Sequence, residues 1–282
     1  MRLLPVISSN QNEWFKATMR LHQASVRRDQ RKFLIEGTHL IEEAIATEWP
    51  LESICFEESW AEQNQSLLHR ILQDANRPQM IVQPATNELL RRLSTTATRT
   101  PVIGVANEKE ISESVQRPIS LAIAIESLQD PGNLGSMIRI AAAGGASHVY
   151  LSNDSVAPTN PKVLRASAGQ WFRNPPIVTD LQPFLRTQKT ASMQILAASA
   201  DGQSFWEVDL TRPTIFLLGN EGNGLSDEMR ALATKSISVP MAPGVESLNV
   251  SITASLLIYE ALRQRKGSSR IGASYPEPSR GA

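Results

Sequence analysis

Three glycine-bearing polar loops in the second half of the sequence carry the residue types and spacings that could do chemistry. The first is DPGNLG at 130–135, and Arg139 follows it shortly afterwards. The second is LGNEGNGL at 218–225, and the third is PMAPGVESLN at 240–249. Each loop follows a predicted strand or directly precedes a predicted helix. Open α/β sheets bind ligands in such loops, at the carboxyl ends of their strands.

The glycines of the second loop would let its backbone approach a ligand closely. The loop reads G-x-x-G-x-G without a following Lys-Ser/Thr, so the sequence does not support a phosphate-cradling P-loop. A G-x-G-x-x-G dinucleotide fingerprint after an early strand is absent as well. Taken alone, this loop fits a turn-rich connection as well as a ligand site.

Alternating strands and helices are predicted to position these loops. Strands are predicted at 121–125, 148–151, 194–198, 214–218 and 237–239. Helices are predicted at 134–143, 160–168, 227–234 and 248–265, the third with Ser226 as its N-cap. This alternation is typical of an α/β domain with a parallel sheet.

A smaller α/β unit is predicted ahead of this domain, again with a largely parallel sheet. Its strands are expected at 33–37, 51–56, 80–83 and 102–106, and its helices at 11–31, 38–47, 60–75 and 86–93. The segment 107–118 is polar and lacks apolar periodicity, so it is predicted to be a linker. The predicted organisation is therefore a domain at 1–106, this linker, a domain at 119–266 and a disordered tail at 267–282.

Composition favours a cytosolic globular protein. Hydrophobic residues make up 41% and charged residues 20% of the chain. No apolar run approaches the roughly 18 residues that span a bilayer, and the start lacks a signal-peptide pattern. The single cysteine, Cys55, excludes an intrachain disulfide and is expected to be a packed core thiol. Because the histidines are scattered, no metal site is expected.

A formal net charge of zero conceals a basic N-terminal segment. Residues 1–32 hold seven basic and two acidic side chains. Lys16, Arg20, Arg27 and Arg31 would follow one stripe of the helix predicted at 11–31. That stripe is either a solvated helix face or a face that contacts nucleic-acid phosphates.

Taken together, the three loops resemble in order and spacing the signature motifs of the SPOUT superfamily, in its SpoU/TrmH branch. The stretch KVLRASAG at 162–169 is similar to the segment between motifs one and two, and the resemblance covers about 119–265. More weakly, SNQN at 9–12, FLIEG at 33–37 and Thr100-Pro101 before Gly104 resemble a substrate-binding domain of the ribosomal protein L30e fold. That domain is typical of members that modify ribosomal RNA.

The resemblance implies a fold and an activity. Members transfer a methyl group from S-adenosylmethionine to an RNA ribose 2′-hydroxyl, here expected in 23S ribosomal RNA, with transfer RNA as the alternative. They need no metal. They work as homodimers with the active site at the subunit interface. Their C-terminal chain passes through a loop and forms a trefoil knot that makes the donor pocket, which no general folding rule would predict.

Five residues match catalytic positions of the family. Arg139 matches the catalytic arginine, which either acts as a base or stabilises the developing alkoxide and holds phosphate. A guanidinium is a poor proton acceptor, which counts against the first of these roles. Asn133 either caps its helix and also positions Arg139 or the substrate, or serves as a cap alone. Glu221 orients Arg139 or a partner subunit, or is a turn residue on the surface. Ser247 and Asn249 hydrogen-bond the substrate or orient the donor, or simply begin a helix.

The methyl donor is expected against the second and third loops. Apolar side chains suit its adenine, and backbone amides and carbonyls read the edge of the base. Donor-binding residues implied by the resemblance are Leu218, Gly219, Asn220, Gly222, Val239, Met241 and Leu248. Of these, Val239 and Leu248 could equally be core residues.

One departure and two other function classes stay open. Where the family often has a small residue and then an apolar one after the glycine matching Gly169, this chain has QWFRN. Trp171 in that stretch either stacks on a base, packs at a dimer contact or packs in the interior. The other classes are a non-catalytic RNA-binding protein and a nucleotide-dependent α/β enzyme. Because Cys55 lies outside the motifs, base methylation through a cysteine nucleophile is not expected.

Overall fold

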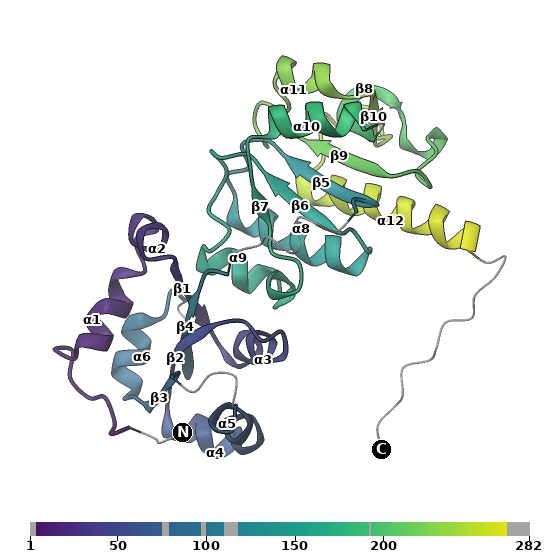
Figure 1. Cartoon of the computed structure of the whole chain (residues 1–282). Coiled ribbons are helices and arrows are strands. Elements are labelled where there is room, and N and C mark those ends of the chain that lie inside the picture. Colours follow the sequence, from purple (N-terminus) through teal and green to yellow (C-terminus); the bar gives the residue numbers. More distant parts are fainter. Residues whose placement is uncertain (1–3, 75–78, 97–99, 110–117, 192, 270–282) are drawn as a thin grey trace.

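The fold, taken from a computed structural model, consists of two α/β units side by side (Figure 1). The structure describes residues 4–74, 79–96, 100–109, 118–191 and 193–269. Most of the predicted linker and the predicted tail from 270 onward lie outside the described residues.

The N-terminal unit has a mixed sheet in the order β1-β4-β2-β3. Its strands are β1 (Lys32–Glu36), β2 (Leu51–Phe56), β3 (Ile81–Pro84) and β4 (Val102–Asn107). Its helices are α1 (Glu13–Arg20), α2 (Ala24–Gln30), α3 (Thr38–Ala46), α4 (Glu58–Gln63), α5 (Gln65–Leu72) and α6 (Asn87–Leu93). The prediction of a largely parallel sheet is wrong here, because β4 inserts between β1 and β2 and runs antiparallel to both.

Helices cover both faces of this sheet because the strands are apolar on both sides. Along β1, Phe33 and Ile35 pack with α3 and α5, whereas Leu34 packs with α1 and α6 on the opposite face. Cys55 is fully buried on that second face, and burial raises the pKa of its thiol. The prediction of a packed core thiol is confirmed.

The helix predicted at 11–31 is wrong as a continuous element, since the chain turns at 21–23 between α1 and α2. Arg27 is 4% exposed, and its Nη1 donates to the carbonyls of Leu21 and His22 at 2.9 Å each. These bonds satisfy carbonyls that the end of α1 leaves free. Arg31 ends α2 in the left-handed conformation. The predicted basic stripe therefore does not exist, and Arg27 cannot contact phosphates.

The C-terminal unit has an all-parallel sheet in the order β10-β8-β9-β5-β6-β7, as predicted. Its strands are β5 (Leu121–Ile125), β6 (His148–Leu151), β7 (Ile177–Val178), β8 (Gln194–Ser204), β9 (Thr214–Leu218) and β10 (Lys235–Ser238). Continuous apolar runs such as LAIAI in β5 are typical of parallel strands buried on both faces. The trefoil knot stays a prediction.

Helices α8, α9 and α12 cover one face of this sheet, and α10 and α11 cover the other (Figure 1). The helical elements are α8 (Pro131–Ala143), α9 (Pro161–Ala166), η1 (Gln170–Phe172), α10 (Leu181–Thr190), η2 (Phe205–Glu207), α11 (Asp227–Leu232) and α12 (Val250–Ser269). The last helix begins two residues later than predicted and extends past Gly267, where the tail was expected to begin. Within the described ranges, no helix is long and apolar enough to cross a membrane.

Two glycines of the α8 region allow helices to approach closely. A Cβ on Gly135 would lie 2.4 Å from the Cβ of Ala166 in α9. A Cβ on Gly144, just after α8, would lie 2.1 Å from Ile258 Cγ2 in α12. Both approaches are possible only because glycine has no side chain, and the close contacts hold α8 rigidly between α9 and α12.

The two units share one hydrophobic core at their junction. Trp171 of the C-terminal unit is 3% exposed, with its ring centroid 5.1 Å from that of Phe33 and 4.9 Å from that of Trp49. Buried packing, one of the three interpretations of Trp171, is confirmed. At the edge of this core, Arg173 Nε lies 2.8 Å from Glu43 Oε2. Packing and ion pairs thus fix the units relative to each other.

Candidate active site

The three polar loops meet through a chain of side-chain hydrogen bonds. Asn133 Nδ2 donates to Glu221 Oε1 at 2.9 Å, which joins the first loop to the second. Asn249 Nδ2 donates to Asn133 Oδ1 at 3.0 Å, which joins the third loop to the first. Asn133 therefore stands at the centre of the arrangement, with donor and acceptor both engaged.

Asn133 is available for this role because another residue caps α8. Asp130 is the N-cap, and its carboxylate accepts from the Asn133 amide nitrogen at 2.8 Å. This backbone hydrogen bond is the main cause that holds the pKa of Asp130 below its usual value. The helix begins at Pro131, three residues earlier than predicted, with proline in the first turn where it is favoured. The capping interpretation of Asn133 is therefore wrong.

Asn220 fixes the shape of the second loop. Its Nδ2 donates to the Ser127 carbonyl at 2.7 Å, while its Oδ1 accepts from the Gly222 amide at 2.7 Å. A Cβ on Gly219 would lie 2.1 Å from the carbonyl carbon of Gly224, so only glycine fits there. The loop is thereby closed on itself and attached to the strand end of β5.

Residues after β5 and β6 support the loops and were missed by sequence reasoning. Glu126 accepts from the Ser226 amide at 2.8 Å and from its hydroxyl at 2.7 Å, which fixes the start of α11. Asp154 accepts from Ser127 and Ser152 hydroxyls, and these bonds lower its pKa. Their one sequence signal is position, since each follows the carboxyl end of a predicted strand.

A cavity of about 530 Å³ opens between the second and third loops. Every predicted donor-binding residue lines it: Leu218, Gly219, Asn220, Gly222, Val239, Met241 and Leu248. Glu221, Ser247 and Asn249 line it as well. The prediction missed the wall from β8, β10 and α12, formed by Ala198, Ser199, Ala200, Ile237, Thr253 and Leu257.

The charged groups on this cavity are acidic. Glu221 and Glu246 line it, and no lysine, arginine or histidine does so among the described residues. Carboxylates attract a cationic ligand and repel a polyphosphate. The cavity therefore suits a positively charged small molecule and argues against the nucleotide-dependent alternative. Nor do the described ranges contain a group of three or more His, Cys, Asp or Glu side chains placed to hold a metal.

Arg139 lies apart from the other predicted catalytic residues. It is exposed on α8, does not line the cavity and has no hydrogen-bond or ion-pair partner in the part of the chain that the structure describes. Within one chain, Glu221 bonds Asn133 and makes no bond to Arg139. The structure thus brings together Asn133, Glu221 and Asn249, places Ser247 beside them on the cavity, and leaves the guanidinium free for a group from outside.

Comparisons with known proteins agree with this geometry. The profile of the SpoU rRNA Methylase family matches residues 120–259, and that of the MRM3-like substrate binding domain matches residues 12–104. The chain is also 37% identical over 268 residues to an uncharacterized tRNA/rRNA methyltransferase from Synechocystis, covering 94% of this chain and 96% of that relative. The chain belongs to the SpoU rRNA methylase family. The resemblance stated from the three motifs is confirmed.

Further SpoU-family relatives share both units. The 23S rRNA (guanosine(2553)-2′-O)-methyltransferase RlmP from Bacillus subtilis is 28% identical, over 90% of this chain and 97% of its own length. The crystal structure of the SpoU methyltransferase AviRb from Streptomyces viridochromogenes in complex with AdoMet superposes with a TM-score of 0.80 at 25% identity, covering 91% of this chain and 99% of that one. The SPOUT fold with an N-terminal substrate-binding unit is therefore confirmed.

Proposed function

We propose that this SpoU-family protein transfers a methyl group from S-adenosylmethionine to a ribose 2′-hydroxyl of 23S ribosomal RNA. One observation carries the proposal: the second and third motifs line one cavity whose charged groups are acidic, and Asn133 of the first motif is hydrogen-bonded to Glu221 and Asn249 on that lining. Relatives that match over most of their length are named 23S rRNA 2′-O-methyltransferases, which supports 23S ribosomal RNA as the substrate. We propose that residues 1–106 and 119–266 form the protein's two domains.

The cavity fits the methyl donor in size and charge. Small-molecule sites typically enclose about 300–1,000 Å³, and this cavity holds about 530 Å³. The backbone of 218–222 and the side chains of Val239, Met241 and Leu248 would hold the adenosine, while Glu221 and Glu246 complement the positive sulfonium. When bound, the donor supplies an electrophilic methyl group.

The remaining residues would serve the acceptor ribose. Asn133, Glu221 and Asn249 form a bonded rim that can orient the ribose beside the cavity, and in-line positioning is the main requirement of methyl transfer. In the proposed reaction the 2′-oxygen would bond to the methyl carbon as the carbon–sulfur bond breaks, the neutral thioether would leave as S-adenosylhomocysteine, and the hydroxyl proton would pass to water. We propose that Arg139 stabilises the negative charge developing on that oxygen, because a guanidinium donates hydrogen bonds well and accepts protons poorly.

The test is transfer of labelled methyl from S-adenosylmethionine to total RNA of a strain that lacks this protein. We expect label in the large ribosomal RNA and, after digestion, in a 2′-O-methylnucleoside. Label confined to transfer RNA would favour the alternative substrate. If the protein binds donor and RNA but transfers no label, either to free RNA or to assembling ribosomal particles, the result would favour a non-catalytic RNA-binding protein.

We further propose that the protein works as a homodimer, with α12 in the interface. Ile252, Leu256 and Tyr259 are 50%, 40% and 52% exposed and fall at i, i+4 and i+7 on one helix face. Such a contiguous apolar face is typical of a protein interface. The face directly follows Asn249, so a second copy seated there would lie beside the site and could present its ribose-binding surface to Arg139.

Leu256→Glu is expected to convert the dimer into a monomer, because a carboxylate at the centre of an apolar interface loses its hydration. Light scattering coupled to gel filtration measures the mass. The matched control is Val178→Glu, an apolar residue of similar exposure on the edge strand β7, which should leave the mass unchanged. A Leu256→Glu protein of unaltered dimeric mass would rule out this face.

A further inference from the structure

We infer that the sugar-phosphate backbone of RNA binds to a basic surface that crosses the junction between the two units. We call it the junction surface, and its cations are Arg20, Arg91, Arg92, Lys162 and Arg165. The inference rests on the proposed function, since it places the RNA of that reaction on the protein.

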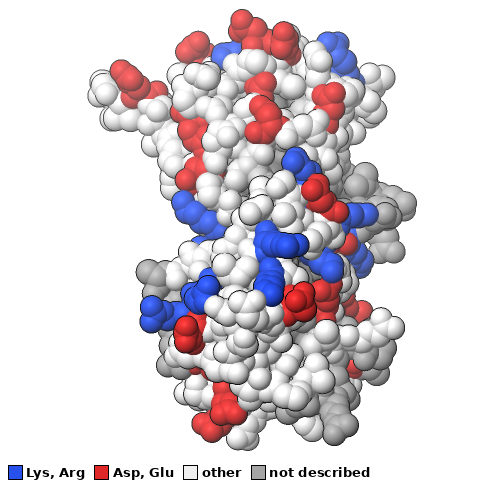
Figure 2. Space-filling model, turned by 90° about the vertical axis from the view of Figure 1, so that its left-hand side faces the viewer, with Lys and Arg blue, Asp and Glu red and all other residues white. Residues whose placement is uncertain are grey.

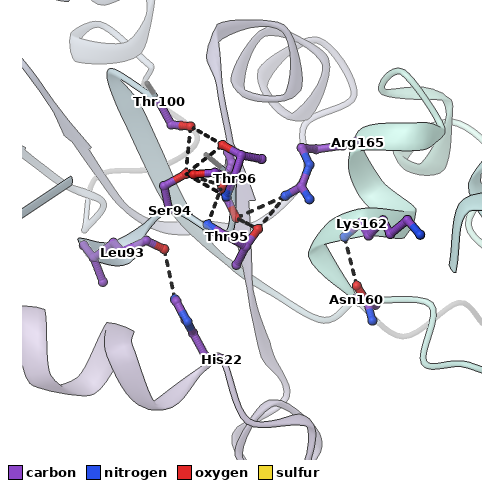
Figure 3. Close-up of polar contacts among 10 residues, drawn as sticks. His22, Leu93, Ser94, Thr95, Thr96, Thr100, Asn160, Lys162 and Arg165 are labelled. Atoms are coloured by element: carbon purple, nitrogen blue, oxygen red, sulfur yellow. Dashed lines mark hydrogen bonds and ion pairs between the residues drawn. The ribbon is translucent and has the colours of Figure 1, made fainter. Parts of the chain in front are cut away.

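The elements that carry these cations converge, as Figure 3 shows. The turn after α1 meets the end of α6, because His22 Nε2 lies 2.9 Å from the Leu93 carbonyl. The residues that follow α6 meet α9 of the other unit, because Arg165 Nη1 donates to Thr95 Oγ1 at 2.5 Å. Segments from both units therefore form one continuous surface.

Charge on α1 and α6 is polarised toward this surface. Each helix has an acidic residue in its first turn, Glu13 or Glu88, and basic residues in its last turn, next to the junction. Figure 2, which views this side of the molecule, shows Lys and Arg gathered across its middle with a smaller number of Asp and Glu among them, while most Asp and Glu lie toward the upper end. A zero net charge thus coexists with a local excess of positive charge, which is what attracts RNA phosphates.

Much of this positive charge is not neutralised by the protein. Arg20 and Arg91 are exposed and have no ion-pair or hydrogen-bond partner among the described residues. Arg92 lies over the Phe15 ring, 5.5 Å from its centroid. Of the five cations, Arg165 and Lys162 face carboxylates in the described ranges, at 3.4 Å from Glu36 and 3.5 Å from Asp130.

Helix stabilisation explains part of the pattern but not Lys162. Cations in the last turn of a helix interact favourably with its dipole, which would account for Arg20, Arg91 and Arg92. Lys162, however, lies in the first turn of α9, where the dipole disfavours a cation, and its side chain is 57% exposed. The Asp130 carboxylate, 3.5 Å away, offsets this in part, and an anionic partner from outside would contact Lys162 together with the helix-end arginines.

Hydroxyl groups order the centre of the junction surface. Ser94, Thr95 and Thr96 follow α6 directly, and Ser94 Oγ lies 3.0 Å from both Thr96 Oγ1 and Thr100 Oγ1. Ser94 Oγ and Thr95 Oγ1 donate to the buried Glu36 carboxylate at 3.1 and 2.6 Å, so their hydrogens are not available to phosphate oxygens. These bonds fix the segment that joins the cations of the two units, and the exposed cations supply the phosphate contacts.

The junction surface also leads to the proposed active site. Lys162 contacts Asp130, which caps α8 and bonds the backbone of Asn133. The shared core around Trp171 holds the two units in place, so the surface exists before RNA arrives. RNA bound along it would reach Asn133 with its register set by both units.

The test compares two double variants in binding of in vitro transcribed 23S ribosomal RNA across a salt series, without S-adenosylmethionine. Arg91→Gln with Lys162→Gln removes one junction cation from each unit. The matched control, Arg70→Gln with Arg186→Gln, removes one exposed cation from each unit on α5 and α10. Each lost phosphate contact reduces the magnitude of the slope of log affinity against log salt by about 0.7–0.9. The slope of the junction variant should therefore be smaller in magnitude by about 1.4–1.8, and that of the control should not change.

Separate readouts distinguish failure of this inference from failure of the proposed function. If the junction variant has the wild-type salt slope while the wild-type chain transfers methyl, the inference that RNA binds the junction surface is overturned and the proposed function stands. The expected loss of slope, without methyl transfer by the wild-type chain, keeps the surface and overturns the reaction. A wild-type chain that does not bind 23S ribosomal RNA overturns both. Unchanged S-adenosylmethionine affinity shows that the variants are folded.

Discussion

Arg139→Ala is expected to lower the rate of methyl transfer about 10²- to 10³-fold and to leave the affinity for S-adenosylmethionine unchanged. The magnitude is that of removing one hydrogen-bond donor that stabilises an oxyanion. Donor affinity should persist because Arg139 lies on α8, outside the cavity lining. Single-turnover transfer to ribosomal RNA and calorimetric titration of the donor measure the two quantities.

Two further variants sharpen this experiment. Arg139→Lys keeps the positive charge but loses the planar fork of donors, so it should recover only part of the rate. Arg186→Ala, at an exposed site on α10, should transfer methyl at the wild-type rate. Normal turnover by Arg139→Ala would remove the residue from the proposed chemistry.

Trp171→Ala is expected to lower the free energy of unfolding by about 3–5 kcal/mol, the usual cost of emptying a buried aromatic site. The Trp171 ring is 3% exposed and packs edge-on against Phe33 and Trp49, so its loss opens the core that both units share. Urea unfolding followed by circular dichroism measures the change. Separation of the curve into two transitions would be a further sign of uncoupled units.

The structure supplies two controls for this experiment. Trp206 is 64% exposed, so Trp206→Ala should cost less than about 0.5 kcal/mol. Trp171→Phe keeps most of the packing and removes an indole N–H that has no hydrogen-bond partner among the described residues, so it should cost much less than Trp171→Ala. Equal losses for Trp171→Ala and Trp206→Ala would contradict the shared core.

The sequence was most informative where backbone geometry demands one residue type. Gly219 and Gly135 sit where any Cβ would collide with neighbouring atoms, so the motifs that contain them could be recognised and the cavity lining predicted. The all-parallel sheet followed from the alternation of predicted strands and helices, and apolar runs such as LAIAI agree with burial on both faces. The sequence did not predict which residues of β8 and α12 line the cavity, because residues such as Ala198 and Thr253 are common types that indicate no particular chemistry.

Other features depended on tertiary contacts that a linear pattern does not contain. Asp130 and Asn133 are both good helix caps, and only the structure shows that the earlier residue takes the cap and frees the later one. Arg27 has the spacing of a surface stripe, yet the turn after α1 buries it against two carbonyls. The short β7 has too few residues to show a period. Helix α10 does carry apolar residues at helical spacing, at Leu181, Phe184 and Leu185, but Pro183 among them obscures the signal.

The strand order of the C-terminal sheet has a consequence for the speed of folding. The early strand β5 lies in the interior of the sheet, and its partner on one side is β9, with Ile125 beside Leu218. During synthesis that edge of β5 stays open until β9 leaves the ribosome, and the face of α8 stays uncovered until α12 follows. Such high contact order predicts slow folding, with an open strand edge that favours aggregation in the meantime. Chaperone assistance during synthesis should therefore raise the yield of this protein.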